Sequence, residues 1–214
     1  MIGSSEISHA MDCCVYLVDA GEMVMIDAGT GQSTNLLIDN IHSLGLMPEK
    51  LTTLVITHAH IDHIGSLAEL KQKYNLKMIA HELDADAIQT GKGVGAQYYG
   101  VNYVPVNVDI KLSGAENDRK IGSQFFKFLH IPGHTAGSMA VLLETGNKKV
   151  LFGQDIHGPY HRMWGGDASK ARESLKKLIA ARADILCEGH FGIIKPAEAV
   201  EEFIYDYLNG LEGR

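Results

Sequence analysis

Four potential metal ligands lie within six positions of the stretch THAHIDHIG, residues 57–65: His58, His60, Asp62 and His63. Imidazoles and a carboxylate packed this closely are costly in an apolar core, because buried polar groups need partners. Neutral imidazole and carboxylate are ligands of zinc and also of iron or manganese. Residues i and i+2 at a strand end face the same side, so His58 and His60 are expected to bind one ion. Asp62 and His63 are displaced toward the next helix and are expected to reach a second ion.

Three further potential ligands each follow an apolar run that reads as a strand. FFKFLHIPG leads to His134, KVLFGQ to Asp155 and ADILCEG to His190. Ligands gather at the carboxyl ends of strands in layered α/β folds, so all seven side chains are expected in one cleft. Seven ligands are too many for one tetrahedral ion but suit two. Two ions about 3.5–4 Å apart can share a hydroxide and polarise a carbonyl or phosphoryl oxygen.

The composition is that of an ordinary soluble globular protein, and the partner expected for it is a small-molecule substrate. The chain has 214 residues with 45% hydrophobic and 21% charged residues, which is ordinary for a globular protein. No apolar run reaches the roughly 20 residues that span a bilayer, and the N-terminus lacks the pattern of a secretory signal. The net charge of −7 argues against nucleic acid as a partner. An odd and sparse set of three cysteines, Cys13, Cys14 and Cys187, predicts reduced thiols and a cytoplasmic protein. A homodimer is expected only because it is the commonest oligomeric state of soluble proteins.

The elements that must position these ligands alternate between strands and helices, twice along the chain. This order predicts an α/β (α+β) fold with two sheets packed together and helices outside. No linker or low-complexity tract interrupts it, so a single domain over residues 1–214 is expected. The expected strands are 13–19, 22–29, 52–57, 76–81, 108–114, 123–131, 138–145, 148–153 and 183–190. The expected helices are 33–45, one from about 64, 82–90, 169–181, and one from about Pro196 to Gly210.

The motifs THAHIDHIG, IPGHTAGS, LFGQDIHG and LCEGH, in this order, resemble those of the metallo-β-lactamase superfamily, with a glyoxalase II-like metal site. The resemblance covers residues from about 12 to 192. It implies a four-layer αββα sandwich with the metals at one edge. It also implies two divalent ions, with zinc expected and iron or manganese as alternatives. The ligands implied are His58, His60 and His134 for metal 1, Asp62, His63 and His190 for metal 2, and Asp155 as the bridge.

The family resemblance further implies a dinuclear hydrolase in which a bridging, metal-bound hydroxide attacks an ester, thioester or lactone carbonyl. Asp62 is then also a catalytic candidate, because it can pass a proton to the leaving group. Asp27, in MIDAGTG, either supports a ligand histidine from behind or is a turn residue before Gly29. A carboxylate at Asp155, where the main zinc β-lactamases have a thiolate, disfavours antibiotic hydrolysis. Only 24 residues follow His190, enough for one helix and not for the glutathione-binding domain of glyoxalase II.

Three other functions stay open. The first is an oxidoreductase of the persulfide dioxygenase type, with one iron held by His58, His134 and Asp155. The second is a phosphodiesterase, although the second domain or basic arm of the family's nucleases is not visible. The third is a metal or ligand sensor, which would have no open coordination position. Metal content and metal identity separate these possibilities.

Several residues near the motifs are weaker candidates. His157 and His161 are expected to contact substrate or relay protons, or else to be exposed loop residues. Tyr160 is a candidate donor to a developing oxyanion, and Trp164 is expected to line the pocket or anchor its loop. The segment 91–107 is a long loop whose tyrosines either form an aromatic wall over the metals or pack against their own helix. The histidines expected to be structural are His9, His42, His81 and His130.

Overall fold

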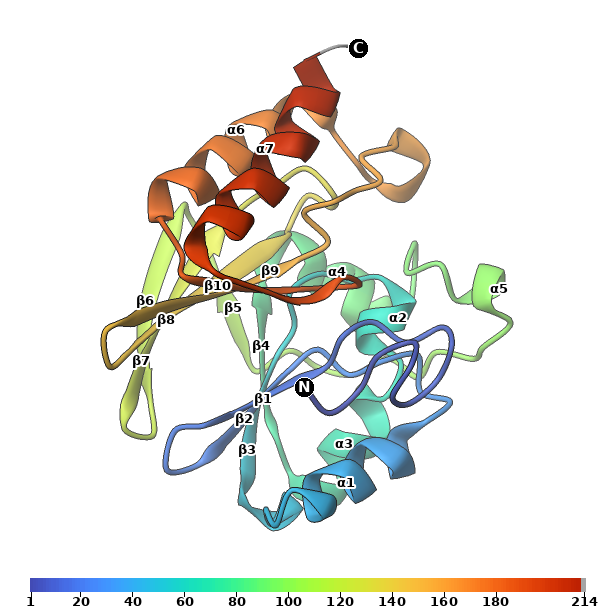
Figure 1. The fold of residues 1–214 in the computed structure, drawn as a ribbon. Coiled ribbons are helices and arrows are strands. Elements are labelled where there is room, and N and C mark those ends of the chain that lie inside the picture. The colour runs from blue at the N-terminus through green and yellow to red at the C-terminus, as the bar shows by residue number, and fades with distance from the viewer. Residues whose placement is uncertain (213–214) are drawn as a thin grey trace.

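Two β-sheets pack face to face, with helices on both outer faces, in a computed structural model that describes residues 1–212 (Figure 1). The first sheet has five strands in sequence order: β1 (Tyr16–Asp19), β2 (Met23–Ile26), β3 (Leu51–Val55), β4 (Lys77–His81) and β5 (Ile110–Leu112). β1 pairs antiparallel with β2, and the remaining pairs are parallel. This is the αββα sandwich expected from the motifs.

The second sheet has six strands in the order β11-β10-β9-β8-β7-β6. Only β9 and β10 pair in parallel, so the carboxyl ends of these two strands lie next to each other. The strands are β6 (Glu116–Ile121), β7 (Gln124–His130), β8 (Met139–Thr145), β9 (Lys148–Gln154), β10 (Ile185–Glu188) and β11 (Gly192–Ile194).

Helices lie outside both sheets and in the loops at one edge. α6 and α7 cover the second sheet, while α1 and α3 lie on the far side of the first (Figure 1). The helices are α1 (Thr34–Ser43), α2 (Ile61–Ile64), α3 (Leu67–Tyr74), α4 (Glu82–Thr90), α5 (Ala96–Tyr99), α6 (Ala168–Ala181) and α7 (Ala197–Glu212). Two 3₁₀ helices, η1 (Pro48–Lys50) and η2 (Arg162–Trp164), complete the set within residues 1–212. No helix in this range is both long and apolar enough to cross a bilayer.

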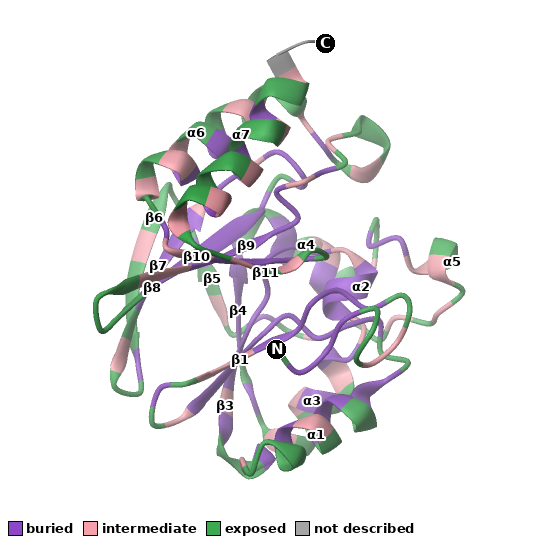
Figure 2. Cartoon of the chain, in the orientation of Figure 1, coloured by how far each residue is buried: buried purple, intermediate pink, exposed green. Residues whose placement is uncertain are grey.

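Three apolar clusters fill the spaces between the four layers, and burial is concentrated along the two sheets (Figure 2). Phe126 and Phe128 are fully buried between the two sheets. Leu37 and Leu54 belong to the cluster under α1, and Leu175 to the cluster under α6. β2 is buried at all four positions, which is why its sequence MVMI is a continuous apolar run without alternation.

Sequence reasoning missed two strands, misplaced the end of one helix and merged two helices into one. β6 has the polar sequence ENDRKI and is largely exposed at the sheet edge, and β11 has three residues, so neither gave an apolar pattern. The expected end of the last helix at Gly210 is wrong, because α7 continues to Glu212. The helix expected from about residue 64 is two helices, with Gly65 between them. A Cβ on Gly65 would lie 2.0 Å from the backbone of Thr30, so only glycine fits there.

Candidate metal centre

The predicted ligands meet at the carboxyl ends of strands from both sheets. The chain leaves β3 at Val55 and carries His58 and His60 into the cleft before α2 begins. His134 follows β7, while Asp155 and His190 follow the parallel neighbours β9 and β10. The ligand atoms form two groups, each with all its atoms within 4.8 Å of one another. The first group is His58, His60 and His134, and the second is Asp62, His63, Asp155 and His190.

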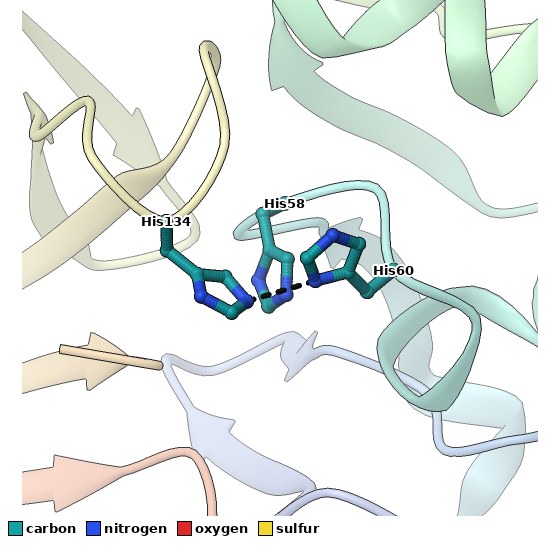
Figure 3. A group of neighbouring side chains, drawn as sticks. All are labelled: His58, His60 and His134. Atoms are coloured by element: carbon teal, nitrogen blue, oxygen red, sulfur yellow. Dashed lines mark hydrogen bonds between the residues drawn. The ribbon is translucent and has the colours of Figure 1, made fainter. Parts of the chain in front are cut away.

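In the first group, two imidazole nitrogens face each other at a short distance (Figure 3). Nδ1 of His60 lies 2.8 Å from Nε2 of His134. The other nitrogen of each ring contacts a backbone carbonyl, that of Trp164 at 3.1 Å for His60 and that of Pro159 at 3.0 Å for His134. A carbonyl oxygen only accepts, so each ring donates an N–H there. With one N–H on each ring, the two facing nitrogens carry lone pairs. Two lone pairs at this distance repel unless the nitrogens share a proton or a metal cation lies beside them.

His58 presents a third lone pair to the same space. Thr57 donates its hydroxyl to Asp27 at 2.6 Å, so its oxygen accepts from Nδ1–H of His58 at 3.2 Å. Nε2 of His58 is then unprotonated, buried, and without a hydrogen-bond partner among residues 1–212. Buried polar atoms in folded proteins are nearly always paired. Three converging lone pairs therefore suit a bound divalent ion.

Asp155 lies between the two groups. Its Oδ2 is 3.3 Å from Nε2 of His134 in the first group and 3.3 Å from Nε2 of His190 in the second. Its Oδ1 is 3.2 Å from Nε2 of His63. Asp62 approaches His190 at 3.4 Å and His63 at 3.8 Å. One carboxylate thus faces ligands of both groups, which is the geometry required of a bridge.

Asp27 contacts both halves of the THAHIDHIG stretch from behind. Its Oδ2 accepts Nδ1–H of His63 at 2.8 Å, and its Oδ1 accepts the N–H of Thr57 at 2.8 Å. The bond to Asp27 holds Nδ1 of His63 behind the cleft and directs its Nε2 toward Asp155. Of the two readings of Asp27, support of a ligand histidine matches these contacts. The residue is also held at φ +59°, a conformation that non-glycine residues rarely adopt.

The backbone around Asp155 is similarly constrained. Gln154 has φ +48°, a left-handed conformation that costs on the order of 1–3 kcal/mol in a non-glycine residue. Gly189 lies so close that a Cβ there would be 2.1 Å from Oδ1 of Asp155. The Gln154 conformation changes the chain direction at the end of β9, and the missing side chain at Gly189 leaves room for the Asp155 carboxylate.

The two groups differ in charge. Burial lowers the pKa of His134 to about 4 and holds the pKa of His58 well below its usual value, so both rings are neutral near pH 7. Burial also opposes the charged form of His190, but hydrogen bonds to Asp155 and Asp62 outweigh it and raise the pKa of His190 to about 10. In the metal-free protein, His190 therefore holds a proton between the two carboxylates. This is the behaviour of a cation site that is filled by a proton when no metal competes.

A cavity of about 310 Å³ opens directly onto the ligands. Its aromatic walls are Tyr99, from the 91–107 loop, and Trp164, against which Tyr98 packs with ring centroids 4.7 Å apart. Tyr103 instead donates its hydroxyl to the carbonyl of Ile88 and packs on the core. Tyr99 therefore contributes to the aromatic wall that was one expectation, whereas Tyr103 packs against α4 and the core. The lining residues are His60, Asp62, Val94, Gly95, Tyr99, His134, Asp155, His157, Gly158, Pro159, Trp164 and His190.

The weaker candidates His157, Tyr160 and His161 differ in whether they line the metal cavity. His157 lines the cavity and donates Nδ1–H to Glu188 at 2.8 Å. Sequence reasoning missed Glu188; its signal was a carboxylate inside the apolar run before His190, and the structure buries it completely. The prediction of Tyr160 as an oxyanion donor is wrong, because its hydroxyl donates to the carbonyl of Ile156 and the residue lies outside the metal cavity. His161 lines a neighbouring cavity of about 830 Å³ that shares His157 and Pro159 with the first.

With this fold and this arrangement of ligands, residues 12–190 match the model of the metallo-β-lactamase superfamily. The chain belongs to this superfamily, which is one of metallo-hydrolases. Its fold is also that of a subclass B3 metallo-β-lactamase of Bradyrhizobium japonicum, with a TM-score of 0.80 at 22% identity. That superposition covers 94% of this chain and 85% of the lactamase chain.

Curated relatives include proteins with named and unnamed activities. A hydroxyacylglutathione hydrolase of Halorhodospira halophila is 32% identical over 70% of this chain and 51% of its own length. A probable metallo-hydrolase of Methanocaldococcus jannaschii is 25% identical over 76% of this chain and 78% of its own. An uncharacterized protein of Aquifex aeolicus is 27% identical over 94% and 95%. The alignment thus spans only about half of the hydroxyacylglutathione hydrolase.

Proposed function

We propose that this protein is a metal-dependent hydrolase that holds two divalent cations and cleaves an ester, thioester or lactone. The observation that carries the proposal is the convergence of unprotonated nitrogens from His58, His60 and His134 beside the Asp155 carboxylate. These atoms repel one another unless a cation is bound, so the donor set fits a metal. Zinc is the expected ion for this set of ligands.

The proposed ligands follow the two groups. His58, His60 and His134 would hold the first ion, Asp62, His63 and His190 the second, and Asp155 would contact both. Asp27 would keep His63 in the required tautomer. Bound ions of this kind supply a nucleophile from water at neutral pH and polarise a carbonyl oxygen.

The chain's own groups complete the proposed chemistry. Asp62 lines the cavity, and we assign to it the transfer of a proton to the leaving group. Tyr99 and Trp164 would hold the acyl part of the substrate against the ligands and limit the access of water. The neighbouring cavity, joined at His157 and Pro159, offers space for the rest of a larger substrate.

The cavity lining favours a carbonyl substrate over a phosphodiester. Among the described residues, those lining the metal cavity include no Lys or Arg, while Val94, Tyr99, Pro159 and Trp164 give it apolar walls. Phosphoryl groups are usually recognised by arginine or lysine side chains in addition to metals. The hydroxyacylglutathione hydrolases among the relatives support a thioester as the first substrate to try.

The test is metal quantification of protein purified without added ions, followed by a panel of thioesters, lactones and phosphodiesters. Two zinc ions per chain with thioester or lactone turnover would support the proposal. One iron per chain with oxygen consumption on a persulfide would replace it with the mononuclear dioxygenase. Bound metal with no turnover of any member of the panel would favour a sensor.

A further inference from the structure

The three histidines of the first group come from two separate loops. His58 and His60 follow β3 of the first sheet, whereas His134 follows β7 of the second. Each ring is oriented by its own backbone or hydroxyl partner, but those contacts do not fix one loop relative to the other. A metal site needs its ligands placed to within about 0.5 Å, so something must hold the two loops together.

Asp84, in the first turn of α4, contacts both loops with one carboxylate. Its Oδ2 accepts the N–H of Ala59 at 2.9 Å, the residue between His58 and His60. The same oxygen accepts the hydroxyl of Thr135, next to His134, at 2.7 Å. Its Oδ1 accepts the N–H of Gly137 at 2.8 Å. Asp84 is 5% exposed, so these bonds are shielded from water.

The chemistry of this contact requires a carboxylate. Each of the two oxygens faces a backbone N–H, one on Ala59 and one on Gly137. An asparagine would have to point its NH₂ at one of these two donors, leaving that buried N–H unpaired. The approach is also very close, since a Cβ on Gly137 would be 2.7 Å from Cγ of Asp84. Aspartate opposite glycine is therefore the combination that fits.

Asp84 is itself held in place at the start of α4. Nδ1 of His81 accepts the N–H of Leu83 at 3.3 Å and caps the helix. The His81 ring stacks on His130 at the end of β7, with ring centroids 3.9 Å apart and an interplanar angle of 10°. The beginning of α4 thus contacts strand ends of both sheets. These contacts hold the backbone of Asp84 in position, so its carboxylate reaches the two loops from a fixed point.

We propose that Asp84 is the positioning residue of the first metal site, because its carboxylate fixes the loop of His58 and His60 relative to the loop of His134. The inference rests on the metal centre proposed above. It predicts a selective effect: loss of this carboxylate weakens the first site and leaves the second site, whose ligands it does not contact, nearly unchanged. Removal of groups that support metal ligands typically weakens metal binding by about 10- to 100-fold.

The experiment measures Co²⁺ binding to metal-free protein in two backgrounds that separate the sites. His190→Ala leaves the first group of ligands intact, and His58→Ala leaves the second. Asp84→Asn is introduced into each background, and affinity is measured by chelator competition together with the visible d–d spectrum. We expect Co²⁺ affinity to fall by about 10- to 100-fold, with an altered spectrum, only in the His190→Ala background.

Two control variants separate positioning from general destabilisation. Asp86→Asn changes an exposed carboxylate of the same helix and should alter neither site. Asp12→Asn removes another buried carboxylate. Asp12 accepts hydrogen bonds from Thr30, Ser8 and Ser33 and has no such bond to a residue of the first ligand group. This substitution should lower the melting temperature without changing the spectrum of the first site. If Asp84→Asn fails to fold, Thr135→Val, which removes one of the three bonds, takes its place with a smaller loss expected.

The outcomes are distinct. An unchanged first-site affinity and spectrum in Asp84→Asn, or in Thr135→Val where it substitutes, overturns the inference. An equal loss of Co²⁺ affinity at both sites also overturns it, because the role of Asp84 is then only structural. Failure of both parent backgrounds to bind Co²⁺ would instead contradict the proposed metal centre.

Discussion

Nδ1 of His60 and Nε2 of His134 lie 2.8 Å apart, although 74 positions separate the two residues in the chain. Each ring donates its remaining N–H to a backbone carbonyl, so the contact brings together two lone pairs. A folded chain keeps such a contact when a cation offsets the repulsion. This relationship links the fold, which joins the two loops, to the metal chemistry proposed for the cleft.

Replacement of His58 by alanine should abolish hydrolysis while the fold remains. His58 is buried but contributes its Nε2 only to the ligand group. We expect kcat/KM to fall by more than the roughly 100-fold typical of supporting residues, together with loss of bound metal. Circular dichroism and metal analysis check the two halves of the prediction. His42→Ala, an exposed change in α1, is the matched control, and full activity of His58→Ala would contradict the proposed site.

Metal binding should release protons mainly at the second group. The pKa of His190 is raised to about 10, so at pH 7 this ring carries a proton that the metal must displace. Burial lowers the pKa of His134 to about 4, so this ligand of the first group binds metal without such a release. Affinity for the second ion should therefore rise about tenfold per pH unit below pH 10 for each proton displaced. Calorimetric titration of metal-free protein in buffers with different ionisation enthalpies measures the proton count, and equal release at both steps would contradict this assignment.

Gly189→Ala should damage the metal centre through a steric effect alone. The added Cβ would lie 2.1 Å from Oδ1 of Asp155, which must then move away from the ligands that it faces. We expect metal affinity to fall by about 10- to 100-fold, as for other changes that misplace a ligand. Gly93→Ala is a useful comparison, because a Cβ there meets nothing within 4 Å, although its φ of +78° makes that change mildly strained. Wild-type metal content in Gly189→Ala would show that Asp155 does not hold the ions.

Two tyrosines near the cleft should respond differently to replacement by phenylalanine. The hydroxyl of Tyr160 is bonded to the carbonyl of Ile156, so Tyr160→Phe should cost about 1 kcal/mol of stability with little effect on turnover. Tyr99 lines the metal cavity, and burial raises its pKa to about 12, so it keeps its proton. Tyr99→Phe should lower kcat/KM by about 2- to 10-fold, the value of one hydrogen bond. Thermal melts measure the loss of stability, and steady-state rates on the same ester measure the loss of turnover. A larger loss of turnover in Tyr160→Phe than in Tyr99→Phe would restore Tyr160 as a catalytic donor.

The candidate ligands were predictable because their signal is local. His58, His60, Asp62 and His63 stand together in the sequence, and His134, Asp155 and His190 each follow an apolar strand. Asp84 gave no such signal, because its partners Ala59 and Gly137 contact it through backbone N–H groups that have no sequence signature. The error over Tyr160 has the same origin. Its neighbours in sequence indicated the cleft, while its actual partner, the carbonyl of Ile156, could be found only from the folded loop.

The sequence alone determined the chemical types in the cleft, the strands that lead to them and the layered α/β fold, because each depends on residues within a few positions of one another. The tertiary structure alone decided which nitrogen of each histidine faces the cleft, which carboxylate contacts both ligand groups, and how the loops of the two sheets are held in register. Most of those properties depend on contacts between residues 25 or more positions apart in the chain, such as Ala59 with Asp84 and His60 with His134. The first of these contacts joins loops after neighbouring strands of one sheet, and the second forms only when the two sheets pack together.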